Sequence, residues 1–328
     1  MIAWIGRQSA YVFVAILTLA GTFSSPSQAA DKVLYLLPSL ASLPAFAPFM
    51  LAQYKGYYKA EGLEVEFQTG KGGTDVALQL GAGNADLGGG VGDTSIIVRP
   101  NGIPVKSVAV LGGRSLLFIA VLADSGIDGP KNLKGKTIAT WSLQDTTYYS
   151  LLGTLAAVGL TKDDVKIESV GPVNVWKLLV ARQADAMGAV PDWIASAEAA
   201  GAKLKIFASQ DYFPSMPQAI IASDKMIATK PDVIRRFVRA TLRGVQDILA
   251  NPDAAADDYI KAIPANADRL PEMKRTLQLY ATMVYPGQKR LGEMDEVRLG
   301  ELQNFYLKEK IIDTKTDLKK LYTNAFIP

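Results

Sequence analysis

The chain has 328 residues and contains neither cysteine nor histidine. Without cysteine it can form no disulfide, and it cannot carry a lipid-modified cysteine behind a leader. Without histidine it lacks the base of Ser-His-Asp and Cys-His catalysis and a common ligand of zinc sites. Carboxylate, lysine or tyrosine acid–base chemistry remains available, but no spacing in the chain favours it. The sequence therefore predicts a protein that is not an enzyme and that holds no metal and no cofactor.

A strong charge of either sign is also absent, because the formal net charge is only +3. Such a balance gives no basic footprint for nucleic acid. The length is ample for two lobes that each bury a core of their own. We therefore expect no nucleic-acid partner.

The first 29 residues have the pattern of a secretory leader. A single charge, Arg7, precedes an apolar run from Ala10 to Leu19, and small residues follow. The run is too short to span a bilayer, and no later segment is long and apolar enough to do so. We predict a signal peptide over residues 1–29, cleavage near Ala29 or Ala30, and a diffusible protein of the periplasm.

A 22-residue segment occurs twice, 99 positions apart. Gly72–Asp93 reads GGTDVALQLGAGNADLGGGVGD and Gly171–Asp192 reads GPVNVWKLLVARQADAMGAVPD, with nine identical positions. Unrelated segments of ordinary composition would match at roughly one or two. Each copy has apolar residues at helical spacing, then a short strand, a turn and a second helix start. The repeat predicts two similar lobes.

Strands and helices alternate around both copies, which predicts a mostly parallel α/β sheet in each lobe. In lobe one we expect strands at 33–38, 63–68, 85–89 and 105–111 and helices at 44–54 and from about 94. In lobe two we expect strands at 136–140, 165–170, 184–188 and 204–208 and helices at 146–158 and 192–200. After residue 224 the pattern is helical, and the arginines of an amphipathic helix over 231–249 are expected to face solvent.

Two further strands connect the lobes. Strand 116–122 leads out of lobe one, and strand 218–223 leads back. Two such crossings predict a hinge near residues 115–123 and 216–222. Lobe one would then comprise residues 30–115 plus 220–328, and lobe two residues 120–217.

Three segments resemble a known family. PAFAPFMLAQYKGYYKAEGLEVEF, GGTDVALQLGAGNADLGGG and NLKGKTIAT are similar to stretches of the solute-binding proteins of bacterial ABC importers. The subgroup they resemble holds sulfonate, taurine, nitrate and thiamine-pyrimidine receptors. The resemblance implies a two-lobed periplasmic-binding-protein fold of type II and a monomer that hands a small-molecule solute to an ABC permease and its ATPase.

The resemblance leaves two rival functions open. The same superfamily includes enzymes that make the thiamine pyrimidine by consuming one of their own histidines, which this chain lacks. A secreted enzyme that uses carboxylate or tyrosine chemistry on this fold is one rival. A partner that reports its ligand to a membrane receptor is the other.

Candidate ligand contacts lie in loops that follow the carboxyl ends of strands, where ligands bind in such sheets. Several of these loops open a helix, whose free N–H groups favour an anion or a carbonyl oxygen. Helix capping is the competing explanation for the threonines and for Asp93 and Asp192, and surface exposure for Arg114. The predicted ligand-binding residues are Ser42, Phe46, Gly73, Thr74, Gly92, Asp93, Thr94, Ser95, Arg114, Trp141, Ser142, Gln144, Thr146, Thr147, Asp192, Trp193 and Tyr212.

The aromatic and acidic residues near the predicted cleft limit the classes of solute that we expect. Trp141 and Trp193 fall in predicted cleft loops, whereas Trp176 is expected in the core. Two carboxylates at the cleft, Asp93 and Asp192, would disfavour a small bare anion such as nitrate. We expect a sulfonate, an aromatic acid or a pyrimidine-like solute, because an aromatic wall suits a ring or an apolar tail.

Overall fold

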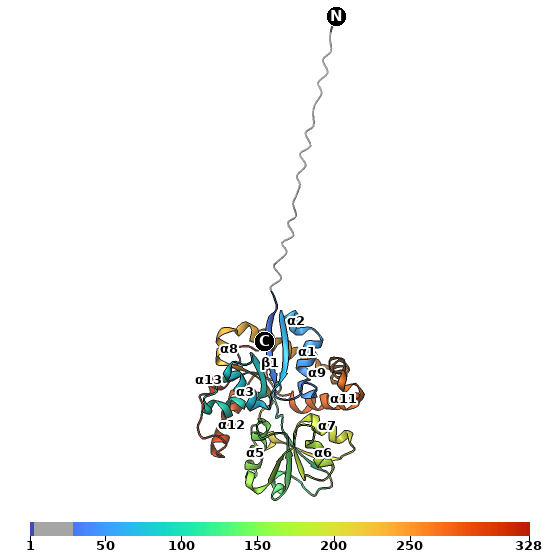
Figure 1. Ribbon diagram of the computed structural model, residues 1–328, viewed down its shortest axis with the longest axis vertical. Helices are drawn as coiled ribbons and strands as arrows, with labels where there is room; N and C mark the ends of the chain where they lie inside the picture. Colours follow the sequence, from blue (N-terminus) through green and yellow to red (C-terminus); the bar gives the residue numbers. More distant parts are fainter. Residues whose placement is uncertain (3–28) are drawn as a thin grey trace.

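The computed structural model describes residues 1–2 and 29–328, so the leader predicted over 1–29 lies almost wholly outside the described residues. Two lobes follow one another along the long axis, and each is a five-stranded mixed sheet flanked by helices (Figure 1). Within the described part of the chain, no helix combines the length and apolarity that crossing a bilayer requires. The two-lobed α/β prediction is confirmed.

The sheet of the first lobe has the order β2-β1-β3-β10-β4. Its strands are β1 (Asp31–Leu37), β2 (Leu63–Thr69), β3 (Leu87–Val91), β4 (Val105–Val110) and β10 (Gln218–Ser223). β1 is parallel to β2 and β3, and β10 runs antiparallel between β3 and β4. β3 and β10 are buried throughout, as expected for strands covered on both faces.

The sheet of the second lobe has the order β7-β6-β8-β5-β9, which matches the first position for position. Its strands are β5 (Phe118–Leu122), β6 (Thr137–Thr140), β7 (Lys166–Ser169), β8 (Ala186–Ala189) and β9 (Leu204–Ala208). β5 runs antiparallel to β8 and β9. The expectation of a mostly parallel sheet therefore holds, and the antiparallel strand of each lobe is the one that enters from the other lobe.

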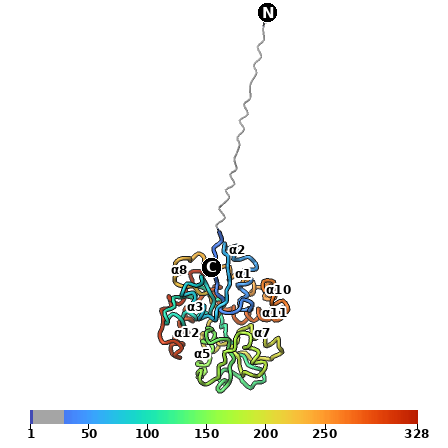
Figure 2. Tube along the Cα trace, in the orientation of Figure 1, coloured from blue at the N-terminus to red at the C-terminus, as the bar shows by residue number. Residues whose placement is uncertain are grey.

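Short helices connect the strands, and a longer set follows them. The first lobe contains α1 (Ala47–Tyr54), α2 (Tyr57–Ala60), α3 (Gly73–Ala82) and α4 (Thr94–Val98), and the second contains α5 (Thr147–Ala157), α6 (Val175–Val180) and α7 (Pro191–Ala199). After β10 come α8 (Asp224–Thr229), α9 (Pro231–Ala250), α10 (Pro252–Ala262), α11 (Leu270–Leu279), α12 (Glu296–Lys308) and α13 (Leu318–Leu321). Figures 1 and 2 show these C-terminal helices back on the first lobe, around β1.

One pair of identical residues in the repeat has the same structural role in both lobes. Asp86 precedes β3, and its carboxylate accepts a hydrogen bond from the backbone N–H of Leu34 in β1 at 3.0 Å. Asp185 precedes β8, and its carboxylate accepts from the N–H of Thr137 in β6 at 2.9 Å. Each aspartate therefore fixes the first residues of its strand against the neighbouring strand.

The arginines of α9 agree with the expected solvated face at three positions, since Arg235, Arg239 and Arg243 are exposed, whereas Arg236 is half-buried. The apolar side of the helix is buried at Phe237 and its neighbours, as predicted. Arg236, however, donates to the Glu61 carbonyl at 2.9 Å and pairs with Asp31 at 2.6 Å. The Arg243 guanidinium lies 3.8 Å from the ring centre of Tyr57. These contacts arise because α9 packs against α1, α2 and the strand that follows α2.

Two chain segments cross between the lobes, and polar contacts join them. The hydroxyl of Ser215 donates to that of Ser115 at 2.7 Å. The guanidinium of Arg298, from α12, donates to the carbonyls of Gly113 and Ser215. The crossings therefore lie side by side, while the lobe boundaries and a hinge near 115–123 and 216–222 stay predictions.

The contact between α9 and α1 depends on a glycine and provides a test of the fold. A Cβ added at Gly244 would meet the Pro48 carbonyl oxygen at 2.1 Å. We expect Gly244→Ala to lower the free energy of unfolding by roughly 1–3 kcal/mol or more, since backbone would have to move. At Gly300 of α12 the nearest atom to an added Cβ is 3.4 Å away. Gly300→Ala should therefore be neutral or stabilising by up to about 1 kcal/mol. Equal losses in urea denaturation of both variants would contradict this packing.

Candidate ligand-binding cleft

Three cavities lie at the junction of the lobes and share lining residues. A first outer cavity of about 530 Å³ and a second of about 600 Å³ both contact Leu40 and Pro172. An inner cavity of about 50 Å³ shares Asp192 and Trp193 with the first and Trp141 with the second. The three cavities therefore adjoin one another, and together they are called the cleft below.

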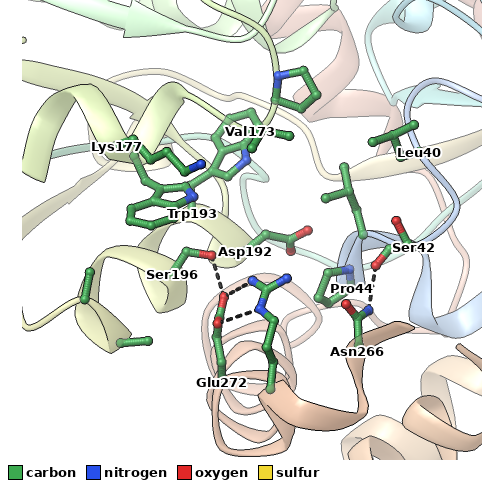
Figure 3. A pocket seen from close by; sticks show the side chains of 16 residues that line it. Leu40, Ser42, Pro44, Val173, Lys177, Asp192, Trp193, Ser196, Asn266 and Glu272 are labelled. Carbon is green, nitrogen blue, oxygen red and sulfur yellow. Dashed lines mark hydrogen bonds and ion pairs between the residues drawn. The ribbon is translucent and has the colours of Figure 1, made fainter. Parts of the chain in front are cut away.

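Figure 3 shows the first outer cavity from close by. Lys177, Asp192, Trp193 and Ser196 come from the second lobe, on α6 and α7. Ser42 and Pro44 approach from the first lobe, and Asn266 and Glu272 from the C-terminal helices. The cavity is therefore walled by three parts of the chain that are far apart in sequence.

Four residues that line the inner cavity each have a buried polar atom without a hydrogen-bond partner. The residues are at most 5% exposed, and the atoms are Asp192 Oδ1, Trp193 Nε1, Gln218 Oε1 and the Tyr280 hydroxyl. Each such group costs roughly 1–3 kcal/mol when it is buried unpaired. Several residues with such atoms around one cavity are typical of a binding site that a ligand completes.

Asp192 links the lobes. Its Oδ2 atom accepts a hydrogen bond from the N–H of Ala45 in the first lobe at 3.0 Å. Burial raises the pKa of its carboxyl to about 6, against the opposing effect of that hydrogen bond and of the nearby Tyr280 hydroxyl. Tyr280 nevertheless forms no hydrogen bond of normal geometry with it. Asp192 does not cap its helix, because α7 begins at Pro191 and the side chain crosses the cleft instead.

Asp93, the repeat counterpart of Asp192, lies outside the three cavities. Its Oδ2 atom accepts from the Tyr306 hydroxyl at 2.5 Å, and its Oδ1 atom has no partner. Burial is the main cause that raises the pKa of its carboxyl to about 6. It makes no side-chain capping bond to α4, so the capping explanation is wrong for both aspartates.

Most of the predicted threonines and glycines lie in or beside a packed contact between the lobes. The Thr146 hydroxyl accepts from the N–H of Val91 at 3.2 Å, and the N–H of Thr74 donates to the Gln144 carbonyl at 3.3 Å. A Cβ on Gly73 would meet Thr146 Oγ1 at 2.7 Å, so only glycine allows this approach. At and beside this contact, the predicted residues that line none of the three cavities are Gly73, Thr74, Gly92, Asp93, Thr94, Ser95 and Thr146.

Other predicted residues do meet at the cleft. Phe46, Trp141, Thr147, Asp192 and Trp193 line the inner cavity, Ser42 the first outer cavity, and Ser142 and Gln144 the second. Arg114 is exposed and donates to the Thr282 carbonyl at 2.9 Å, and Tyr212 is half-buried; neither lines the three cavities. Direct contact of any of these residues with a ligand stays a prediction.

Trp176 is not a core residue, contrary to expectation. On α6 the buried positions are Val175 and Leu179, one helical turn apart. Trp176 lies about 100° around the helix from Val175 and is half-buried at the first outer cavity. The Lys177 ammonium lies 5.8 Å from its ring centre.

Sequence reasoning named five of the sixteen residues that line the inner cavity, and Gln218 and Tyr280 are among those it missed. Gln218 begins β10, and Tyr280 lies in the π-helical turn Tyr280–Val284 behind α11. Single-turn π-segments are frequent at functional sites. No local sequence pattern predicts that either residue lies at the cleft, because both reach it only through long-range packing.

Charge is distributed unevenly in the cleft. The sixteen residues that line the inner cavity include two carboxylates, Asp145 and Asp192, and no lysine or arginine. The outer cavities do hold cations: Arg269, which is paired with Glu272, and Lys177 line the first, and Lys71 lines the second. Among the described residues, no group of three or more His, Cys, Asp or Glu could hold a metal ion. The inner cavity therefore offers acceptors and donors without a compensating cation.

Comparison with protein families decides the classification. The family model described as "NMT1/THI5 like" matches residues 43–255. The chain belongs to the NMT1/THI5-like family. It is 29% identical over 291 residues to the riboflavin-binding protein RibY of Chloroflexus aurantiacus, covering 86% of this chain and 82% of that protein.

Two more proteins extend the family comparison. The 4-amino-5-hydroxymethyl-2-methylpyrimidine phosphate synthase of Aspergillus parasiticus is 28% identical over 256 residues, 71% of each chain. The crystal structure of the periplasmic aliphatic sulphonate binding protein SsuA from Escherichia coli superposes with a TM-score of 0.68 at 15% identity, covering 89% of this chain and 91% of that one. Relatives of this chain are thus named for binding and for synthesis, and this chain has the periplasmic-binding-protein fold.

The raised pKa of Asp192 predicts a pH-dependent stability. Because the folded state holds this proton more tightly, the contribution is full below the unfolded pKa of 3.8 and is lost as the pH rises through about 6. We expect the free energy of unfolding of the wild type, relative to Asp192→Asn, to fall by up to about 3 kcal/mol between pH 4 and pH 7. Urea denaturation at several pH values measures it, and a difference that stays constant with pH would argue against this burial.

Proposed function

We propose that the protein is the periplasmic solute-binding component of an ABC importer and captures a small aromatic solute between its two lobes. The observation that carries the proposal is the inner cavity between the lobes, which four residues with an unpartnered buried polar atom line. Trp141 and Trp193 wall this cavity, and indole rings bind planar solutes by stacking. The ligand would then pass to a membrane permease.

The relatives support the same solute class. One is named for riboflavin, and another for a pyrimidine phosphate, and both names denote planar heterocycles. The sulphonate-binding neighbour supports the binding fold, at an identity too low to suggest a ligand. A sulfonate is also disfavoured by the inner cavity, where two carboxylates and no cation would face it.

Catalysis is the second candidate, because the Aspergillus relative is named as a synthase. This chain contains no histidine, the residue that the resemblance implies such synthases consume. Recovery of unchanged ligand after incubation would favour binding, and a chemically altered ligand would favour the enzyme.

Capture should close the lobes about the predicted hinge. A saturating ligand, found by a thermal-shift screen of sulfonates, aromatic acids, pyrimidines and nitrate, should raise stability by about 2.7 kcal/mol at 100 times its dissociation constant. The same ligand should reduce the radius of gyration in small-angle scattering, since closure brings the lobes together. A scattering profile that does not change at saturation would contradict closure.

Intrinsic fluorescence separates the roles of the tryptophans. Trp141 and Trp193 line the inner cavity, so ligand should replace water around their indoles and change their emission. We expect Trp193→Phe or Trp141→Phe to remove most of this change. Trp176→Phe should leave most of the ligand-induced change in emission intact, because Trp176 lines only the first outer cavity. Loss of the response in Trp176→Phe alone would place the ligand in the outer cavity instead.

A further inference from the structure

The four unpartnered atoms differ in their hydrogen-bonding character. Asp192 Oδ1 and Gln218 Oε1 accept, Trp193 Nε1 donates, and the Tyr280 hydroxyl can do either. They come from α7, β10 and the turn after α11, so both lobes and the C-terminal helices contribute. A solute that pairs with all four must present donors and an acceptor together.

Burial makes this pattern selective. Trp193 is 5% exposed, Asp192 and Gln218 are 4% exposed, and Tyr280 is fully buried. A buried group left unpaired by the wrong solute keeps its full desolvation cost, so discrimination is strong at such positions. A cavity of about 50 Å³ holds only one edge of a ring, and the remainder must extend into an outer cavity.

Charge decides between solute classes. An anionic group at this edge would face Asp192 and Asp145 with no lysine or arginine among the lining residues. A cationic group would suit Asp192 but would leave the Trp193 N–H, a donor only, without a partner. An uncharged edge that carries N–H donors and a carbonyl or ring-nitrogen acceptor can pair with Asp192 and with the Trp193 N–H.

We propose that Asp192, Trp193, Gln218 and Tyr280 form the recognition subsite, and that it takes the uncharged N–H and acceptor edge of a planar heterocycle while rejecting anions. This inference rests on the proposed function and adds the residues and the chemistry of selection. Tyr280 and Gln218 become specificity-determining residues that the C-terminal helices and the returning strand supply.

Tyr280 has a matched control in the same stack. Tyr285 is 2% exposed, its hydroxyl is also unpartnered, and its ring lies 5.4 Å from that of Tyr280. Only Tyr280 lines the inner cavity. Tyr280→Phe and Tyr285→Phe therefore remove the same atom from similar surroundings, and they should differ in ligand affinity and not in fold.

Calorimetry on the mature protein tests the subsite with three sets of probes. The uncharged set is uracil, lumazine and riboflavin; the anionic set is nitrate, methanesulfonate and benzenesulfonate; the cationic probe is benzylammonium. We expect binding within the uncharged set and at least about tenfold weaker binding of every ionic probe. For the uncharged ligand that binds, Tyr280→Phe should weaken affinity roughly three- to tenfold, and Tyr285→Phe less than about twofold.

Asp192→Asn provides the second measurement. The amide oxygen can still accept from Ala45, while the amide nitrogen replaces the free acceptor with a donor. Affinity for the uncharged ligand should fall at least about tenfold, with circular dichroism unchanged.

The outcomes separate the two proposals. Tight binding of benzenesulfonate or benzylammonium with lobe closure would overturn the uncharged subsite and leave the solute-binding function standing. Equal affinity losses in Tyr280→Phe and Tyr285→Phe would also overturn the subsite. A failure of all seven probes to bind would count against the aromatic-solute function and the subsite together.

Discussion

A carboxylate buried between the two lobes is the constraint on which the cleft depends. Asp192 lies at the start of α7 in the second lobe, yet one of its oxygens accepts the Ala45 N–H of the first lobe. The second oxygen has no partner, and the neighbouring Trp193, Gln218 and Tyr280 atoms have none either. Protein interiors rarely leave so many polar groups unpaired at one place, because each costs free energy. The two lobes therefore meet at a place where several buried polar groups have no hydrogen-bond partner.

Two pairs of equivalent aspartates in the internal repeat have different roles: one pair stabilises the sheets, and one member of the other pair lies at the cleft. Asp86 and Asp185 fill equivalent positions and bond equivalent strands, so this pair maintains the sheets. Asp93 and Asp192 are equally matched in sequence, and both are buried with raised pKa values. Their partners differ: Tyr306 of α12 satisfies one oxygen of Asp93, whereas Asp192 faces a cavity. The elements that pack against the two aspartates therefore differ: α12 contacts Asp93, whereas Ala45 of the first lobe contacts Asp192.

Much of the fold could be predicted from the sequence, because it depends on local patterns. The ends of β9 and β10 agree with the strands expected at 204–208 and 218–223, and the repeat implied the matching sheet orders. The residues that line the cleft were harder to predict from the sequence. Asp192 and Trp193 follow a strand end, so their place was deducible, whereas Tyr280 reaches the inner cavity from a helix 80 residues beyond Ala200. Trp176 failed as a core prediction because a six-residue helix has too little periodicity to orient one ring.

The same unpaired atoms give a physical reason for coupling ligand capture to closure. In an open cleft, water can satisfy Asp192, Trp193 and Gln218, so opening removes the cost of burying them. Other polar groups do pair across the contact between the lobes, among them Ala45 with Asp192, Val91 with Thr146 and Arg275 with Glu198. A solute that pairs with the inner cavity interacts more strongly with the closed form than with the open one. Such a difference in affinity is the condition for a ligand to shift a conformational equilibrium. Under the proposed import function, a permease that distinguishes the closed protein from the open one would detect a bound solute without contacting it.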